Sequence, residues 1–217
     1  MEHFLHPYHI NLIRSQVNLL IGAFNFAGDY RVVDATRATA LQNLYDEVPW
    51  QTPEQRDLLT EAGKVRDKDE LKAYLKRLEP YIIPFPEITA AEIRKLFPKV
   101  KKLVLLDLQA IDFSKLTYLG WRDIATKSLY VVYRLNGKWV GTECNYVNGP
   151  KNRSFHCTWC NRSCGGDEIA LVTTQVKNRQ IQDGYKVFGN HICLDSHKCN
   201  EFMTSPAELE KFLSTAR

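Results

Sequence analysis

The positions of the six cysteines constrain the fold of this chain more than any other feature. All six lie after residue 140 of the 217-residue sequence, and four of them form two pairs: Cys157 and Cys160 in a CxxC, then Cys193 and Cys199 in a C-x5-C. Four thiolates match the tetrahedral, soft-ligand preference of a structural zinc ion. We therefore predict one structural zinc ion at these two pairs, whose binding contributes on the order of 10 kcal/mol to folding of the surrounding domain.

Other interpretations of the cysteines stay open. A redox CxxC would require a thioredoxin-like βαβ setting and would leave Cys193 and Cys199 unexplained. A different fourth zinc ligand is available in Cys164 or His197. Cys144 is expected to be a buried, small apolar residue. Four cysteine ligands leave no open coordination position, so a catalytic zinc ion is not expected.

The N-terminal part of the sequence has helical periodicity. Apolar residues recur at three- and four-residue steps over residues 7–26, namely Ile10, Ile13, Val17, Leu20 and Phe24. Similar signals predict helices around residues 33–44, from Thr52-Pro53 to Gly63, and from Asp67 to Leu78. Short loops between four helices favour an up-and-down bundle.

A proline-containing segment follows the predicted bundle. Pro80, Pro84 and Pro86 prevent any helix from continuing through it, whereas its apolar side chains favour a packed connector. We place the domain boundary here, with a helical bundle over residues 1–80 and a C-terminal α/β domain over residues 81–217. The sequence from Thr89 to Glu92 predicts a capping box for a short helix that ends near Phe97.

Beyond residue 100 the apolar pattern changes to that of strands. Residues 103–108 are expected to form a buried strand, and Asn136-Gly137 is expected to be the turn of a hairpin over residues 128–134 and 139–144. A second hairpin is predicted over residues 169–176 and 185–192, with a turn around Asp183-Gly184. A capped helix after Ser205 closes the chain. The predicted fold class is α+β.

Composition and motifs exclude several classes of protein. With 44% hydrophobic and 25% charged residues, the chain has the composition of a globular protein, and it has no apolar run near the about 20 residues of a membrane span. The N-terminus lacks the pattern of a secretory signal, so we expect a cytoplasmic protein without membrane contact. The sequence contains no GxxxxGK[ST], GxGxxG, HExxH or GxSxG motif, and we expect no enzymatic activity.

The net charge of +4 is unevenly distributed. The formal charges of residues 1–80 sum to −2, and those of residues 81–217 sum to +6. This bias is mild, so direct nucleic-acid binding is not expected, and the lysines at 95, 99, 101 and 102 are interpreted as a solvated face. The aromatic residues near the cysteines exceed what a small zinc module needs for its core, and some are expected to face a partner: Phe155, Trp159, Tyr185 and Phe188.

Together these features resemble a known family. The resemblance rests on Pro7-Tyr8-His9, on Ile13-Arg14-Ser15, on the connector YIIPF, on KVKK at residues 99–102, on Gly120-Trp121, and on the cysteine segments CTWCN and ICLDSHKCN. In this order, over essentially the whole chain, they resemble the elongation factor G-binding proteins of the fusidic acid resistance (FusB) type.

The resemblance implies a fold and a function. It implies an N-terminal helical bundle and a four-cysteine treble-clef zinc finger with Cys157, Cys160, Cys193 and Cys199 as ligands. It also implies a non-catalytic, monomeric protein that binds elongation factor G and releases it from the ribosome, including when fusidic acid has trapped it there. Antibiotic resistance and a housekeeping role in translation are both compatible with that activity.

The family's contact surface falls on four positions of this chain, His156, Phe188, His191 and Phe212. Two of them are histidines where the family has aromatic residues, and Phe188 stands where the family has a basic residue. Only Phe212 keeps the family's character. Two other functions stay open: a zinc-containing ribosome- or RNA-binding protein, which would use the basic C-terminal part, and an enzyme of unrecognised type.

Overall fold

The structure is a computed structural model that describes residues 2–26, 28–177 and 184–216. It divides into two compact units, Met1–Pro84 and Phe85–Arg217, and the division falls in the proline-containing segment. Each unit is considered by itself below. Within the described ranges, no helix has the length and apolarity that crossing a bilayer would demand.

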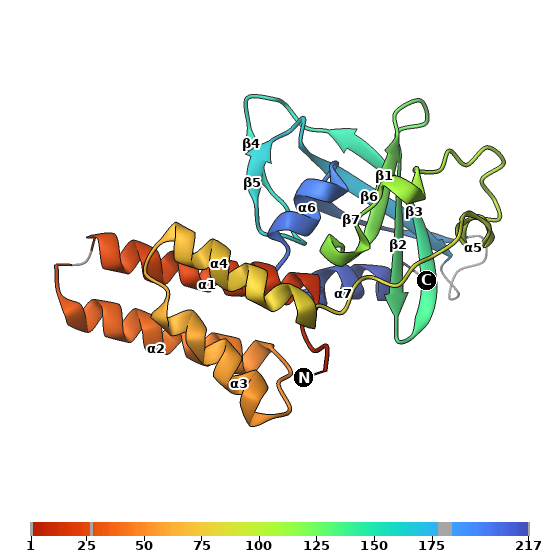
Figure 1. Ribbon diagram of the computed structural model, residues 1–217. Coiled ribbons are helices and arrows are strands. Elements are labelled where there is room, and N and C mark those ends of the chain that lie inside the picture. The colour runs from red at the N-terminus through yellow and green to blue at the C-terminus, as the bar shows by residue number, and fades with distance from the viewer. Residues whose placement is uncertain (1, 27, 178–183, 217) are drawn as a thin grey trace. The chain divides into compact units, whose positions relative to one another are not determined.

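The first unit consists of four helices in the order that the sequence predicts (Figure 1). They are α1 (Pro7–Phe26), α2 (Tyr30–Glu47), α3 (Pro53–Thr60) and α4 (Lys68–Leu78), with short 3-10 turns at Glu61–Lys64 and Glu79–Tyr81. A capping box begins α3, with the Thr52 hydroxyl accepting from the Gln55 N–H and the Gln55 side chain accepting from the Thr52 N–H. Asp67 caps α4 by accepting from the Glu70 N–H at 2.8 Å.

One apolar core holds these helices together, and the ends of the unit close on each other. Leu5 pairs with Ile82 in a parallel bridge, in which the Ile83 N–H donates to the Leu5 carbonyl at 2.7 Å. His9 is buried in α1, and its Nδ1 accepts from the His6 N–H at 3.1 Å. Burial lowers the pKa of His9 to about 3, with a smaller contribution from His6, so the imidazole is neutral at physiological pH.

The second unit is built on a five-stranded antiparallel sheet in the order β1-β2-β3-β6-β7. Its strands are β1 (Leu119–Asp123), β2 (Ser128–Leu135), β3 (Lys138–Asn148), β6 (Ile169–Lys177) and β7 (Tyr185–Cys193), and a separate small hairpin joins β4 (Ser154–His156) to β5 (Ser163–Gly165). The predicted Asn136-Gly137 turn is confirmed, with φ values of 49° and 76° that suit a type I′ hairpin. Asp183, in the second predicted turn, lies outside the described residues.

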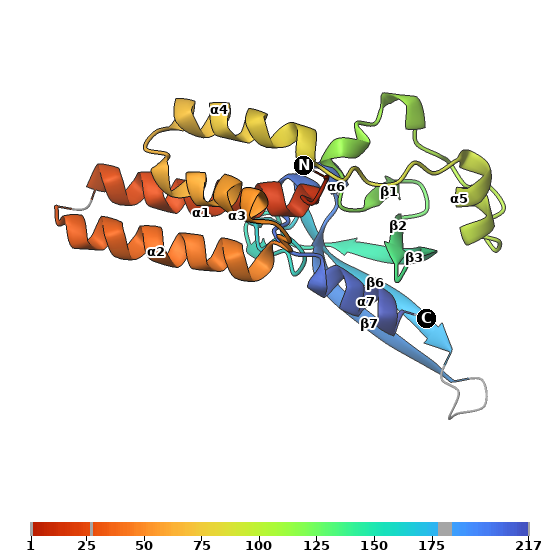
Figure 2. The ribbon, with the colours of Figure 1, turned by 60° about the horizontal axis from the view of Figure 1, so that its bottom comes forward.

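Two apolar clusters cover the two faces of β2. Leu129 and Val131 belong to the cluster that contains the cysteines, α6 (Ser196–Phe202) and α7 (Ala207–Thr215), whereas Tyr130 and Val132 belong to a cluster with α5 (Ala90–Leu96). This division follows from the two-residue alternation of side chains along a strand. Figure 2 shows the long β6–β7 hairpin, with α7 drawn beside it. The four clustered cysteines therefore lie against one face of the sheet.

One predicted element is wrong. Residues 103–107 form no strand, and a short 3-10 turn follows at Leu108–Ala110. The segment is fixed by side-chain packing instead of a backbone ladder: Leu103 and Leu105 pack against the α5 cluster, and the Trp121 indole N–H donates to the Val104 carbonyl at 2.8 Å. An apolar run alone does not distinguish these two ways of burying side chains. Strands β1, β4 and β5 were not predicted.

Candidate metal centre and the surface around it

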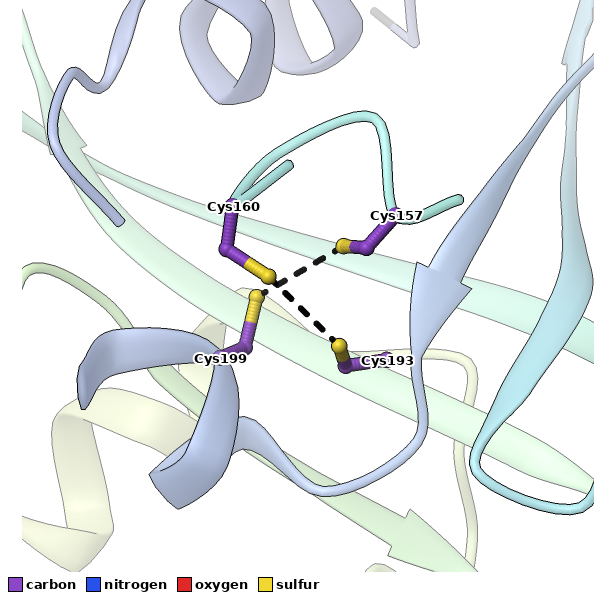
Figure 3. Close-up of side chains that lie close together, drawn as sticks. All are labelled: Cys157, Cys160, Cys193 and Cys199. Carbon is purple, nitrogen blue, oxygen red and sulfur yellow. Dashed lines mark hydrogen bonds between the residues drawn. The ribbon is translucent and has the colours of Figure 1, made fainter. Parts of the chain in front are cut away.

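Four buried cysteines from three parts of the second unit meet in one cluster (Figure 3). Cys157 and Cys160 lie in the turn between β4 and β5, Cys193 ends β7, and Cys199 lies in α6. The four Sγ atoms lie within 4.8 Å of one another, with 3.9 Å between Cys157 and Cys199 and 3.6 Å between Cys160 and Cys193. Sulfurs at 2.3 Å from a tetrahedral zinc ion would be about 3.8 Å apart. The cluster therefore fits a four-thiolate zinc site.

The turn that carries the first pair is closed by backbone hydrogen bonds. The Asn161 N–H donates to the Cys157 carbonyl, and the Cys157 N–H donates to the Arg162 carbonyl, both at 2.9 Å. Asn161 adopts φ of 58°, a left-handed conformation that asparagine tolerates better than most residues. The Thr158 N–H donates to the His191 carbonyl at 2.9 Å and ties the turn to β7.

The second pair is positioned by α6, a helix that the sequence did not predict. Asp195 caps α6 by accepting from the N–H groups of His197 and Lys198 at 2.9 and 3.2 Å. Cys199 lies one turn into α6, and α7 begins only at Ala207. Cys199 therefore lies in a helix of its own, separate from the closing helix that the sequence predicts.

The four thiols are so close together that their full ionisation requires a bound cation. Hydrogen bonds from Cys160 and the other neighbouring thiols hold the pKa of Cys157 far below its ordinary value, whereas interaction with Cys157 raises the pKa of Cys199. Four sulfurs at these distances therefore do not all ionise without a compensating positive charge. A divalent soft metal supplies that charge and accepts all four thiolates.

The alternative ligands lie elsewhere. Cys164 is on β5 outside the cluster, and the exposed His197 faces Glu201, with 3.4 Å between Nδ1 and Oε1. Cys144 is buried, as expected, and burial raises its pKa to about 12. Within the ranges that the structure describes, no second group of three or more His, Cys, Asp or Glu side chains is arranged to hold a metal.

Two residues that support the cluster were missed by the sequence analysis. The buried Asn200 side chain accepts from the N–H groups of Thr117 and Tyr118 and donates to the carbonyls of Tyr118 and Ser196. These bonds connect the metal-bearing helix to the chain that enters β1. The buried Tyr118 hydroxyl interacts with Cys199, and burial is the main cause of its raised pKa. The only local signal is an asparagine directly after the last cysteine.

The four predicted contact residues occupy different environments. His156 is exposed on β4, where its Nδ1 lies 2.8 Å from the Ser163 hydroxyl, and the half-buried His191 stacks on Phe155 with ring centroids 4.9 Å apart. Phe188 is half-buried and, by strand alternation, lies on the opposite face of β7 from His191. Phe212 is only 5% exposed and packs against Trp159 at 5.5 Å. The structure thus brings the two histidines to the cysteine turn and places Phe212 in the core.

Comparisons with known proteins agree with this architecture. Residues 4–86 match the family described as elongation factor G-binding protein, N-terminal, and residues 96–214 match the FBP C-terminal treble-clef zinc-finger family. No curated protein sequence matched the chain. Among solved structures, that of the fusidic acid resistance protein FusC is similar over 99% of this chain and 98% of that one, with a TM-score of 0.79 and 24% sequence identity. At that identity the likeness shows a shared fold.

Proposed function

The chain belongs to the elongation factor G-binding protein family with a treble-clef zinc finger, and from this premise we propose that it binds elongation factor G and promotes its release from the ribosome. Its action is a binding function rather than catalysis. The two family matches, which follow each other along the chain, carry this proposal. The solved relative is described as a fusidic acid resistance protein, which supports protection against that drug as one consequence of factor release.

The treble clef holds one structural zinc ion in this proposal. Cys157, Cys160, Cys193 and Cys199 are its ligands, supported by their burial and by sulfur distances near those of a tetrahedral site. The ion connects the β4–β5 turn, the end of β7 and α6, so it stabilises the part of the second unit that carries the exposed histidines. Zinc here supplies structure, because four thiolates leave no position for a substrate.

The surface that contacts the factor is proposed to include His156, Phe188, His191 and Phe212. Exposure of His156 and partial exposure of His191 support a direct contact for these two side chains. Phe188 is also partly exposed, and it would contact the factor from the opposite face of β7. Phe212 is buried, so it would support the surface indirectly by packing against Trp159 in the cysteine turn. The two units, residues 1–84 and 85–217, are proposed to act in one monomeric protein, and the contact belongs to the second.

Release of the factor follows from differential binding. A protein that binds the release-competent conformation of the factor more tightly than the ribosome-bound conformation shifts the equilibrium by the ratio of the two affinities. A shift from 1:99 to 99:1 requires about a 10⁴-fold ratio. No chemical step is needed, and the ribosome is reached through the factor.

Calorimetric titration of the zinc-loaded protein into purified elongation factor G tests the proposal. We expect saturable one-to-one binding that is weakened at least about tenfold, or about 1.4 kcal/mol, in His191→Ala. Tyr30→Ala is the matched control, because Tyr30 is 75% exposed on the first unit and its loss is expected to leave binding unchanged. A folded, zinc-loaded protein that gives no heat with the factor would refute the proposal.

A further inference from the structure

A short segment of the second unit concentrates positive charge that the proposed function does not use. We call residues 94–102 the basic segment, and its cations are Arg94, Lys95, Lys99, Lys101 and Lys102. All five side chains are exposed. No acidic residue occurs between Glu92 and Asp107, and none of the salt bridges found among the described residues includes these five.

The neighbouring carboxylates accept hydrogen bonds from groups outside the basic segment, and Glu92 also interacts electrostatically with Lys95. Glu92 accepts from the Thr89 N–H and hydroxyl at 2.8 and 2.7 Å, which completes the capping box of α5. Asp107 accepts from the Gln109 N–H at 3.1 Å. Arg94 and Lys95 suit the C-terminal turn of α5 because they complement the helix dipole, but the three lysines at 99–102 lie beyond the helix and the dipole does not account for them.

The backbone of the basic segment is held firmly while its cations face solvent. Phe97 is 5% exposed and packs edge-on against Trp121 and Tyr130, with centroids 5.9 and 5.2 Å away. The Val100 N–H donates to the Phe97 carbonyl at 3.1 Å. On β3, a side chain at Gly141 would come within 2.6 Å of Leu96, so α5 lies directly against this strand (Figure 1). The cations are thus presented from a fixed scaffold.

We propose that the basic segment binds the phosphate backbone of RNA. Phosphate contacts require cations and no apolar pocket, whereas an acidic protein partner would also need buried aromatic or apolar anchors at its centre. Of the apolar side chains between the cations, Leu96, Phe97 and Val100 pack in the α5 cluster, whereas Pro98 is exposed. The choice of RNA over other polyanions rests on the proposed function, which brings the protein to the ribosome.

The charge pattern predicts the strength of the salt dependence. If each of the five cations contacts one phosphate of single-stranded RNA, log K falls against log salt with a slope of about −3.5. Between 50 and 200 mM salt the affinity then falls about 100-fold. The contact has no base specificity, and its binding energy adds to that of the proposed contact with elongation factor G.

Fluorescence anisotropy of the full zinc-loaded chain with a labelled single-stranded polyuridylate tests the inference without elongation factor G. The variant K99Q/K101Q/K102Q is expected to lower the slope to about −1.4, because two contacts remain. K68Q/K72Q/K76Q is the matched control: its three exposed lysines lie on α4, it loses the same charge, and it is expected to keep the wild-type slope.

Several outcomes would overturn the inference. Equal weakening by both triple variants would mean that net charge alone attracts RNA. No salt-dependent binding by the wild type, or binding of polyglutamate in place of polyuridylate, would exclude RNA as the ligand of the basic segment. Because the test omits the factor, loss of factor binding with intact RNA binding would refute only the proposed function.

Discussion

Removal of the Asn200 side chain is the most informative single perturbation of the cysteine cluster. It lies next to Cys199 in α6, and it forms hydrogen bonds with Thr117, Tyr118 and Ser196. The variant Asn200→Ala removes these bonds and leaves the four cysteines unchanged. It therefore separates the support of the centre from the metal–sulfur bonds themselves.

The magnitude of the effect follows from burial. Thr117 and Tyr118 are 5% and 2% exposed, so their N–H groups lose their acceptor in a place that solvent reaches poorly. An unsatisfied buried donor costs about 1–3 kcal/mol. Two such donors, partly relieved by local relaxation, are expected to lower the free energy of unfolding by about 3 kcal/mol. For a unit of this size the melting temperature then falls by about 10 °C.

Two measurements check this expectation. A thermal melt followed by near-ultraviolet circular dichroism reports the stability of the second unit, and transfer of zinc to a chromogenic chelator reports how often Cys199 separates from the cluster. Both the melting temperature and the lifetime of the bound zinc are expected to fall. Asn148→Ala, at an exposed position at the end of β3, is the control and is expected to change neither.

The reasoning would be wrong if Asn200→Ala melted within about 3 °C of the wild type, which corresponds to less than about 1 kcal/mol. It would also be wrong if the melt shifted while zinc transfer stayed unchanged. In that case the hydrogen bonds would stabilise the entry to β1 without supporting the metal-bearing helix.

Three further predictions concern the metal, the thiols and the pH. Chelation of the zinc, or Cys193→Ser, is expected to abolish the near-ultraviolet signal of the second unit, and added zinc restores it in the chelated wild type only. In the zinc-loaded protein a thiol reagent is expected to react rapidly with Cys164 alone. Burial raises the pKa of the Cys144 thiol to about 12, and the metal is expected to hold the other four cysteines. Rapid reaction of all six thiols in the folded protein would contradict this. Because the pKa of His9 is lowered from 6.5 to about 3, its protonation in the unfolded state is expected to reduce stability by about 1.4 kcal/mol per pH unit from pH 6.5 down to about 3, with no effect above 6.5. The free energy of unfolding, measured with urea at each pH, should depend less steeply on pH in His9→Gln than in the wild type. An equal pH dependence in both proteins would argue against a neutral buried imidazole.

Local sequence rules predicted much of this protein because the corresponding structures form between near neighbours. The capping boxes at Thr52 and Thr89 satisfy N–H groups three residues away, and the Asn136-Gly137 turn needs only a left-handed conformation at two adjacent positions. The cysteine pairs were predicted for a related reason, since thiolates at these spacings have few uses other than a shared metal.

Tertiary structure decided what depends on distant partners. Residues 103–107 have the apolar character of a strand but pack as separate side chains against Trp121 and its neighbours. The hydrogen bonds of Asn200 with Thr117 and Tyr118 join residues that are 83 and 82 positions apart, and no local sequence pattern predicts these partners. The family resemblance places Phe212 on a contact surface, yet Phe212 is buried and packs against Trp159. Burial and long-range hydrogen bonds are properties of the packed chain. The sequence therefore determined the locally encoded helices and turns and the two cysteine pairs, whereas the fold determined which side chains remain exposed for a partner.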